Sequence, residues 1–212
     1  MKVALMGHGV VGSGVAEILL EKKESLAEKA GSLLELVKIL DLRDFPQLSY
    51  QELFTKDFSE IESDDSISIV VEAMGGLHPA YDFVRAAIEA GKNVVTSNKA
   101  LVATFYDELL PLVQEKKVLF RCTAAVGGGI GWLSELERAR RSQTIEQVGG
   151  IMNGTCNYIL DSMTRLGLGY DEALKQAQAL GYAEANPSTD VDGIDTWHKV
   201  ILSSNIAFGV TV

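Results

Sequence analysis

Six residues near the amino terminus, Gly7-His8-Gly9-Val10-Val11-Gly12, have the types and spacing that bind a phosphate group. In this GxGxxG pattern the first glycine allows a tight turn, the second lets the main chain approach a pyrophosphate, and the third lets a helix pack closely. An apolar run, Lys2 to Met6, precedes the pattern, and apolar residues recur at helical spacing from Val15 to Leu19. A strand, a glycine turn and a helix in this order predict a dinucleotide site, with a tight turn that binds no ligand as the alternative.

Asp41 and Arg43 are the residues expected to choose between the two nicotinamide dinucleotides. Asp41 ends the apolar run Leu33 to Leu40, where a carboxylate can bond the ribose hydroxyls of NAD. Arg43 could instead meet the 2′-phosphate of NADP, so the sequence fits either cofactor. Ordinary surface turn residues are the other interpretation of this pair.

The elements that must position these residues alternate between strand and helix. Strands are expected over Lys2–Met6, Leu33–Leu40, Ser68–Val71, Val94–Thr96 and Val118–Cys122, and helices from the glycine turn to Lys23, from His78 to Ala90 with Gly91 as the stop, and from Tyr106 to Lys116. Such alternation predicts an α/β domain with a parallel, doubly wound Rossmann-type sheet.

The alternation of apolar strand patterns and helix patterns ends at the glycine-rich segment Val126–Gly129, and a charged helical pattern follows. We place a domain boundary there. Residues 1–130 are expected to form a dinucleotide-binding domain, and residues 131–212 a smaller, incomplete α+β substrate domain. The expected elements of the second domain are a helix over Leu133–Arg141, a strand over Gln147–Met152, a helix over Thr155–Leu166 capped by Asn153, a helix capped by Asp171 that runs to Leu180 and stops at Gly181, and a helix over Ile194–Phe208.

Composition excludes several classes of partner. The 212 residues are 47% apolar and 23% charged, which is typical of a globular protein with a core. The net charge of −10, without a basic cluster, disfavours nucleic acid. Two cysteines without CxxC spacing favour a reducing compartment, and no run is apolar enough for a signal peptide or a membrane span. We therefore expect a cytoplasmic protein that binds neither nucleic acid nor membrane. The three histidines lack metal-ligand spacing.

Five segments resemble the homoserine dehydrogenase family, in the same order along the chain. They are Gly91–Ala103 (GKNVVTSNKALVA), Ala125–Ile130 (AVGGGI), Gly154–Leu160 (GTCNYIL), Leu180–Glu184 (LGYAE) and Asp190–Lys199 (DVDGIDTWHK). The resemblance implies a small-molecule substrate and a reversible hydride transfer between NADPH or NADH and L-aspartate 4-semialdehyde. The product, L-homoserine, leads to threonine and methionine.

The resemblance also implies roles for residues that could perform this chemistry. Lys199 matches the family's proton donor, and Glu184 and Asp195 match positions that hold the substrate's amino group. Reduction of an aldehyde places negative charge on its oxygen, which a nearby cation or acid stabilises. Asp195 and Lys199 stand four positions apart and share a helix face; without the family match, a surface ion pair would be the expected interpretation. Lys99 follows the Val94–Thr96 strand and is expected to meet the nicotinamide or the substrate carboxylate.

Further positions are assigned by correspondence with the family alone. Cofactor contacts fall on Val11, Met74, Gly75 and Gly181. The family also binds a monovalent cation, Na⁺, through backbone oxygens that correspond to those of Thr123, Val126, Gly128 and Ile130. Oxygen ligands suit such a hard cation. A flexible hinge between domains is an equal alternative for this glycine-rich segment.

The chain departs from the family pattern at Met74, Gly131 and Trp197, and family members continue well past the helix that holds Lys199. Two alternatives therefore stand beside an active homoserine dehydrogenase. One is a catalytically weak or inactive relative that retains nucleotide binding, and the other is a related amino-acid dehydrogenase such as aspartate dehydrogenase. An open sheet edge and an apolar face in a partial substrate domain also predict a homodimer.

Overall fold

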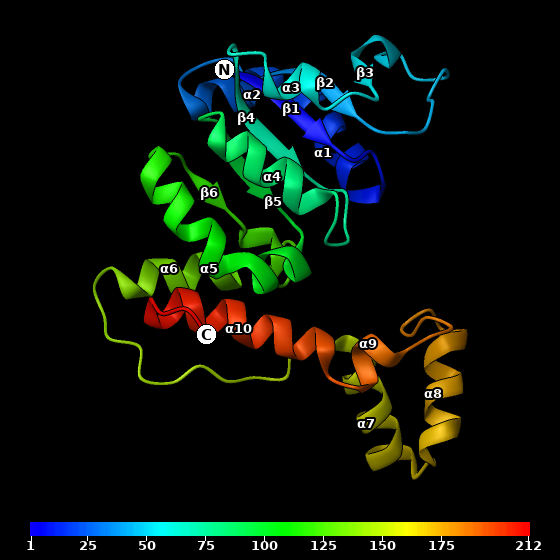
Figure 1. The fold of residues 1–212 in the computed structure, drawn as a ribbon. Coiled ribbons are helices and arrows are strands. Elements are labelled where there is room, and N and C mark those ends of the chain that lie inside the picture. The colour runs from blue at the N-terminus through cyan, green and yellow to red at the C-terminus, as the bar shows by residue number, and fades with distance from the viewer. The chain divides into compact units, whose positions relative to one another are not determined.

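The computed structural model describes residues 1–212, which divide into two compact units, Met1–Gly131 and Trp132–Val212. The first unit combines strands and helices, whereas the second contains helices only (Figure 1). No helix of either unit combines the length and the apolar character needed to cross a membrane.

One six-stranded parallel sheet forms the centre of the first unit, in the order β3-β2-β1-β4-β5-β6. The strands are β1 (Lys2–Met6), β2 (Glu35–Leu40), β3 (Phe54–Thr55), β4 (Ile67–Glu72), β5 (Asn93–Thr96) and β6 (Phe120–Arg121). The strand order reverses between β1 and β4, and sheets of this kind bind ligands beside that reversal, at the carboxyl ends of the strands. The expected doubly wound, Rossmann-type sheet is confirmed.

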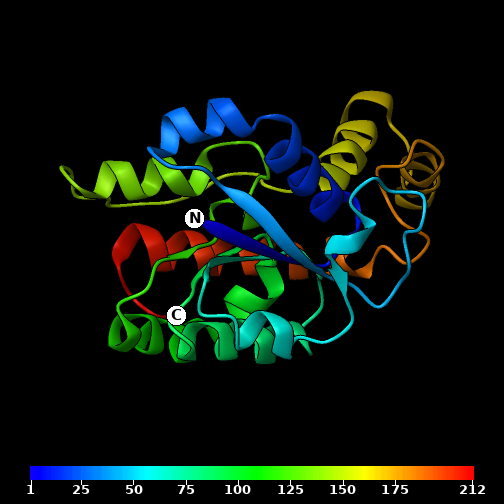
Figure 2. The same ribbon diagram turned by 90° about the horizontal axis from the view of Figure 1, so that it is seen from above.

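Helices cover both faces of this sheet (Figure 2). Helices α1 (Val10–Glu21) and α2 (Lys23–Ala30) lie on one face, and α4 (Ala80–Glu89) and α5 (Lys99–Lys116) lie on the other. Because both faces are covered, successive residues of the central strand β1 are buried, from Val3 to Met6. The remaining elements are the short helix α3 (Ser59–Glu62) and the 3₁₀ turns η1 (Gln51–Leu53) and η2 (Thr123–Ala125).

Five helices make up the second unit. They are α6 (Trp132–Arg140), α7 (Gly154–Leu166), α8 (Tyr170–Ala179), α9 (Ser188–Val191) and α10 (Ile194–Phe208). Helices α7 and α8 pack through a cluster that includes Ile159, Ala173 and Ala177. The Trp132 indole N–H donates to the Ser203 hydroxyl at 2.8 Å and joins α6 to α10.

Two expectations for the second unit are wrong. Residues Gln147–Met152 form no strand, because Gly149 and Gly150 disfavour an extended strand and no segment of residues 132–212 is a strand that could pair with it. Asp171 does not cap α8, since the helix already begins at Tyr170 and Gly169 occupies the capping position. The cap at Asn153 is confirmed, because its side-chain oxygen accepts the Cys156 N–H at 2.8 Å.

Helix α5 begins at Lys99, well before the expected start at Tyr106. The backbone of Phe105 is non-helical (φ −118°, ψ 20°), so a kink divides the helix at the point where the sequence pattern starts again. The sequence therefore predicted only the part of α5 that follows the kink.

Candidate active site

The glycine turn after β1 has the shape of a phosphate cradle. A Cβ atom on Gly7 would lie 2.7 Å from the Ala73 carbonyl oxygen, and one on Gly12 would lie 1.9 Å from the Gly7 carbonyl oxygen. Side chains are therefore excluded at both positions. Gly9 is the N-cap residue of α1, so no capping side chain accepts a hydrogen bond from the first turn of the helix. Nothing lies within 4 Å of the place where a Cβ on Gly9 would be. The first turn of α1 contains no acidic residue, so its N–H groups remain suited to an anion.

Val10 and Val11 complete this turn and are exposed, at 93% and 54% of their surface. Both lie at the start of α1, beside the N–H groups that would meet a phosphate. Met74 and Gly75 follow β4, at the same carboxyl edge of the sheet as the glycine turn. The structure thus brings these assigned cofactor residues together at the predicted edge.

Asp41 follows β2 and is held by four hydrogen bonds. Its Oδ2 accepts the His8 N–H and an Arg43 Nη2–H, both at 2.8 Å. Its Oδ1 accepts the Arg43 backbone N–H and Nε–H, both at 3.0 Å. Hydrogen bonds from Arg43 hold the pKa of the Asp41 carboxyl well below its usual range. Each carboxylate oxygen therefore already has two donors, which fill its usual accepting capacity.

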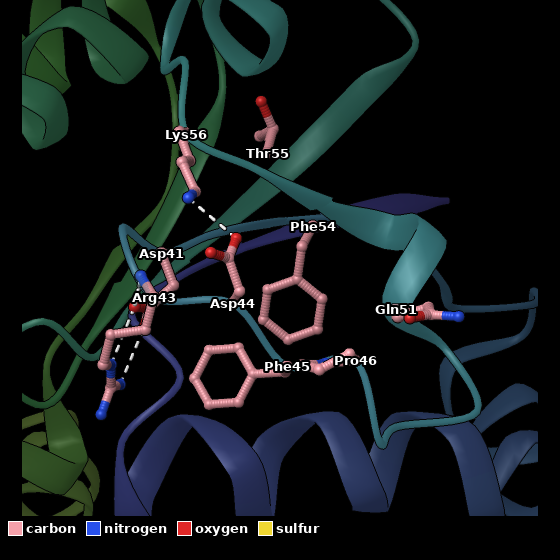
Figure 3. Close-up of a pocket in the computed structure, with 9 residues that line it drawn as sticks. All are labelled: Asp41, Arg43, Asp44, Phe45, Pro46, Gln51, Phe54, Thr55 and Lys56. Atoms are coloured by element: carbon pink, nitrogen blue, oxygen red, sulfur yellow. Dashed lines mark hydrogen bonds and ion pairs between the residues drawn. The ribbon is translucent and has the colours of Figure 1, made fainter.

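Two hollows meet at this ion pair. One, of about 560 Å³, is lined by Gly7, His8, Gly9, Leu40, Asp41, Leu42, Arg43, Lys56, Ala73, Met74, Pro79 and Phe83. The other, of about 330 Å³, is shown in Figure 3 and is lined by Asp41, Arg43, Asp44, Phe45, Pro46, Gln51, Phe54, Thr55 and Lys56. Both hollows contain Asp41, Arg43 and Lys56, so two cations flank the point where they meet. Lys56 also pairs with Asp44 at 2.8 Å.

An aromatic cluster supports the loop after β2. The His8 ring contacts the rings of Phe45, Tyr50 and Phe54, and its Nε2 lies 3.1 Å from the Tyr50 hydroxyl. Burial lowers the pKa of His8, so the neutral ring is favoured. The sequence does not predict this cluster, because its members come from the glycine turn, the loop after β2 and the two-residue strand β3, which show no common periodicity.

The assigned proton donor lies in the second unit, in a buried ion pair. Lys199 Nζ is 2.6 Å from Asp195 Oδ2, and it also donates to the Met152 carbonyl oxygen. The side chains are only 17% and 9% exposed. An ordinary surface ion pair, the interpretation that spacing alone favours, therefore does not describe Asp195 and Lys199.

Asn153 connects this pair to a second carboxylate. Its Nδ2 donates to Asp195 Oδ2 at 2.9 Å and to Asp190 Oδ1 at 2.8 Å. The Thr155 hydroxyl lies 2.7 Å from Asp190 Oδ2. The sequence predicts only a helix cap at Asn153 and no role for Asp190, because no local pattern connects residue 153 with residues 190 and 195. The available signal was the run of acidic residues in Asp190–Asp195.

Replacement of Asn153 separates its two roles. Asn153→Ser keeps an oxygen that can cap α7 but removes the amide that bridges Asp190 and Asp195. Asn153→Ala removes both, and we expect it to lower the free energy of unfolding by about 1 kcal/mol more than serine does, the usual effect of losing a cap. Denaturant unfolding of both variants measures the difference. Equal unfolding free energies would show that the cap contributes nothing.

Glu184 and Gly181 occupy the segment between α8 and α9. Gly181 is in the left-handed region (φ +79°) just after α8, as expected for a helix stop. The Glu184 carboxylate is exposed, and the backbone carbonyl of Glu184 accepts the Gln178 amide N–H at 3.0 Å. Lys99 is half-buried at the first position of α5, beyond the carboxyl end of β5.

The segment assigned to a cation is a turn in the first unit. Gly127 and Gly128 have left-handed φ values of +82° and +56°. The turn's hydrogen bonds are accepted by the carbonyl oxygens of Cys122 and Gly127, from the N–H groups of Ala125 and Ile130. Neither acceptor belongs to the assigned set, which comprises the oxygens of Thr123, Val126, Gly128 and Ile130.

Comparisons with known proteins agree along the chain. The family profile described as "Homoserine dehydrogenase, NAD binding domain" matches residues 7–122, and the profile described as "Homoserine dehydrogenase" matches residues 132–212. The curated homoserine dehydrogenases of Neisseria gonorrhoeae and Lactococcus lactis are 37% and 39% identical over 99% and 100% of this chain. This chain covers 48% and 51% of those two proteins, so it spans about half the length of the curated relatives it matches.

Solved structures show the same likeness. A homoserine dehydrogenase from Thiobacillus denitrificans is 40% identical, with a TM-score of 0.89 over 99% of this chain and 49% of that one. A putative homoserine dehydrogenase from Archaeoglobus fulgidus is 33% identical, with a TM-score of 0.85, and this chain covers 70% of it. A hyperthermophilic archaeal homoserine dehydrogenase in complex with NADPH is 26% identical, with a TM-score of 0.84 over 99% of this chain and 70% of that one.

Proposed function

Because the chain belongs to the homoserine dehydrogenase family, we propose that it catalyses the reversible reduction of L-aspartate 4-semialdehyde to L-homoserine with NADPH or NADH. The observation that carries the proposal is the buried Asp195–Lys199 pair held by Asn153. A lysine fixed in this way is suited to pass a proton to and from a substrate oxygen. In this proposal residues 1–130 bind the dinucleotide and residues 131–212 bind the substrate.

The residues of the first unit suit a dinucleotide. We assign the pyrophosphate to the turn Gly7–Gly12, where side chains are excluded and the helix N–H groups are open. Met74 and Gly75 are assigned to the nicotinamide side, together with Gly181 from the second unit by family correspondence. The nicotinamide, when bound, supplies the hydride in reduction and accepts it in oxidation.

We assign the proton transfer and the binding of the substrate's charged groups to two lysines and two carboxylates. In the direction of reduction, the Lys199 ammonium gives a proton to the aldehyde oxygen as negative charge develops there. Asp195 orients Lys199 and, with Glu184, offers negative charge to the substrate ammonium. Lys99 is assigned to the nicotinamide or the substrate carboxylate. In the direction of oxidation, Lys199 takes the hydroxyl proton.

We propose that NADP is the preferred cofactor. Asp41 would bind the ribose hydroxyls of NAD, but both of its oxygens are occupied by donors from Arg43 and His8. The Arg43 side chain is 61% exposed and lies with Lys56 on the border of both hollows. Two cations at this place favour a 2′-phosphate.

Arg43→Ala tests this preference. A hydrogen bond to a charged group contributes about 1.5–3 kcal/mol, so we expect KM for NADP⁺ to rise about 10- to 100-fold. KM for NAD⁺ should stay the same or fall, because NAD⁺ lacks the 2′-phosphate and the loss of the Arg43 side chain removes two of the donors that occupy Asp41. Arg85→Ala is the matched control, since Arg85 is exposed on α4 and pairs with Glu89. Equal losses with both cofactors, or a wild-type preference for NAD⁺, would contradict the assignment.

A monovalent cation, Na⁺, is proposed to bind the backbone oxygens of Thr123, Val126, Gly128 and Ile130. Support comes from the turn itself, whose hydrogen bonds are accepted by carbonyl oxygens outside this set. A rise in thermal stability or activity when choline is replaced by Na⁺ at constant ionic strength tests the site. Identical behaviour in the two salts would contradict it.

We further propose a cytoplasmic homodimer. Cys122 and Cys156 are thiols rather than halves of a disulfide, which is consistent with a reducing compartment. Exposed apolar side chains recur along α10 at Ile194, Trp197 and Val200, which supports a covered face. Sedimentation at micromolar concentration would give a dimer mass, whereas a monomer mass would remove that part of the proposal.

The function is tested by initial rates with L-homoserine, L-aspartate and each oxidised cofactor. We expect NADP⁺ reduction with L-homoserine only. Tight NADPH binding without turnover would favour an inactive relative, and turnover of L-aspartate would favour an aspartate dehydrogenase.

A further inference from the structure

Glu72, the last residue of β4, is an acidic residue with 0% of its surface exposed. Burying a carboxylate is unfavourable unless hydrogen bonds replace its water. Its Oε1 accepts the backbone N–H groups of Met74 at 2.8 Å and Gly75 at 3.3 Å, and its Oε2 accepts the Thr96 hydroxyl. The side chain thus holds the turn after its own strand and the end of the neighbouring strand β5.

The hydrogen bonds continue from Thr96 to Asn98. Thr96 Oγ1 accepts the Asn98 N–H at 2.9 Å, and Asn98 Oδ1 accepts the Leu101 N–H at 3.1 Å, which caps α5. The Asn98 amide also donates to the Gly76 carbonyl oxygen at 2.6 Å, at the far end of the turn. Glu72, Thr96 and Asn98 therefore form a closed ring of contacts around residues 73–76, and Lys99 is the next residue of the chain.

The geometry of the turn explains why position 72 carries a side chain that accepts hydrogen bonds. Gly75 and Gly76 both lie in the left-handed region, with φ +76° and +71°, so the chain turns sharply after β4. The N–H groups of Met74 and Gly75 donate to Glu72 rather than to a neighbouring strand, so the Glu72 side chain supplies the acceptor that strand pairing would otherwise provide. Glu72 Oε1 accepts both N–H groups, so Oε2 remains to accept the Thr96 hydroxyl. An apolar residue, such as the buried Val70 of the same strand, offers no acceptor.

We propose that Glu72 is a positioning residue for hydride transfer, which fixes the Met74–Gly76 turn and the start of α5 relative to each other. This inference rests on the proposed function, in which Met74 and Gly75 border the nicotinamide and Lys99 meets the nicotinamide or the substrate. Ala73 and Met74 line the larger hollow, and their main chain packs closely against Gly7. Ala73 is also held by β1, since its N–H donates to the Met6 carbonyl oxygen at 2.8 Å. Loss of the Glu72 contacts would therefore shift Met74–Gly76 on the nicotinamide side, while Ala73, Gly7 and the adenosine side keep their contacts.

Glu72→Ala in the full chain tests the proposal. We expect kcat to fall about 10- to 100-fold, since a misplacement of about 1 Å has an effect of this order. The NADPH dissociation constant, measured by nucleotide fluorescence, should stay close to the wild-type value, because Gly7–Gly12 and Arg43 are untouched. Glu72→Gln should restore most of kcat, because its amide oxygen can accept both N–H groups and its NH₂ can bond Thr96 Oγ1.

Val70→Ala is the matched control, because Val70 is equally buried on the same strand but lies outside the ring. This variant should lower Tm and leave kcat unchanged. Hydrogen exchange should be faster at Met74, Gly75 and Leu101 in Glu72→Ala than in Val70→Ala. If Glu72→Ala only lowers Tm and keeps the wild-type kcat, or if Glu72→Gln does not restore kcat, the proposal is wrong.

Failure of the proposed function can be distinguished from failure of this inference. If the wild-type chain binds NADPH but does not oxidise homoserine, the proposed function fails. The fluorescence emission of bound NADPH then tests the positioning role by itself. Glu72→Ala must then change the nicotinamide emission at an unchanged dissociation constant for the positioning role to stand. A wild-type chain that binds no NADPH would overturn both, because there would be no cofactor to position.

Discussion

Lys199→Ala is expected to lower kcat for homoserine oxidation by about 10²- to 10⁴-fold, the usual contribution of a positioned general acid or base. The KM for NADP⁺ should stay near the wild-type value, because Lys199 is not one of the residues assigned to the cofactor. Initial rates at saturating cofactor measure the effect. The loss arises because Lys199 is the group assigned to take the hydroxyl proton, and alanine has no group that can accept it.

Two further variants keep this result interpretable. Lys199→Ala also removes one partner of the buried Asp195, so some stability is lost, and Lys199→Met retains the length of the side chain without its proton. Lys175→Ala is the matched control, since Lys175 is an exposed lysine of α8 in the same unit. Wild-type turnover by a folded Lys199→Met variant would show that the proton donor has been misassigned.

Gly12→Ala is expected to abolish measurable cofactor binding. An alanine Cβ at this position would lie 1.9 Å from the Gly7 carbonyl oxygen, closer than any real contact. Either the glycine turn or the start of α1 must move, and both carry the N–H groups assigned to the pyrophosphate. Titration with NADPH followed by nucleotide fluorescence measures the loss.

Gly14→Ala is the matched control for this variant. Gly14 lies in the same helix, but nothing lies within 4 Å of the place where its Cβ would be. Alanine is favoured over glycine inside a helix by about 1 kcal/mol, so Gly14→Ala should bind NADPH normally and unfold at a slightly higher temperature. Equal binding by the two variants would contradict the assignment of the pyrophosphate to this turn.

Elements with strong local signals could be predicted from the sequence. The strand Lys2–Met6 and the helix Ile194–Phe208 were predicted at their observed bounds, because each combines an apolar pattern with a glycine or polar boundary. The cap at Asn153 and the stop at Gly181 follow from residue type alone.

Elements that depend on distant partners could not be predicted. Strand β3, Phe54–Thr55, is too short for any alternation and exists because it pairs with Ile39 and Leu40. Helix α2 has no buried residue, so its sequence shows no apolar stripe. The segment Gln147–Met152 contains strand-forming residues but has no pairing strand in the second unit.

The same distinction holds for the candidate site. The glycine turn is one continuous segment, Asp41 directly follows an apolar run, and Asp195 and Lys199 stand four positions apart. Each of these features therefore carries a local signal. Asn153 bridges Asp190 and Asp195 only after α7 and α10 have folded, and Glu72 meets Thr96 only because β4 and β5 pair in register. Side chains that position other side chains therefore needed the structure.

Transfer of deuterium from L-homoserine labelled at its hydroxymethyl carbon to the nicotinamide of NADP⁺ tests the central claim most directly. Mass spectrometry of the nucleotide after incubation with the full chain is expected to find deuterated NADPH, and the Lys199→Met variant is expected to form almost none. NADPH binding without any deuterium transfer by the wild-type chain would contradict the account.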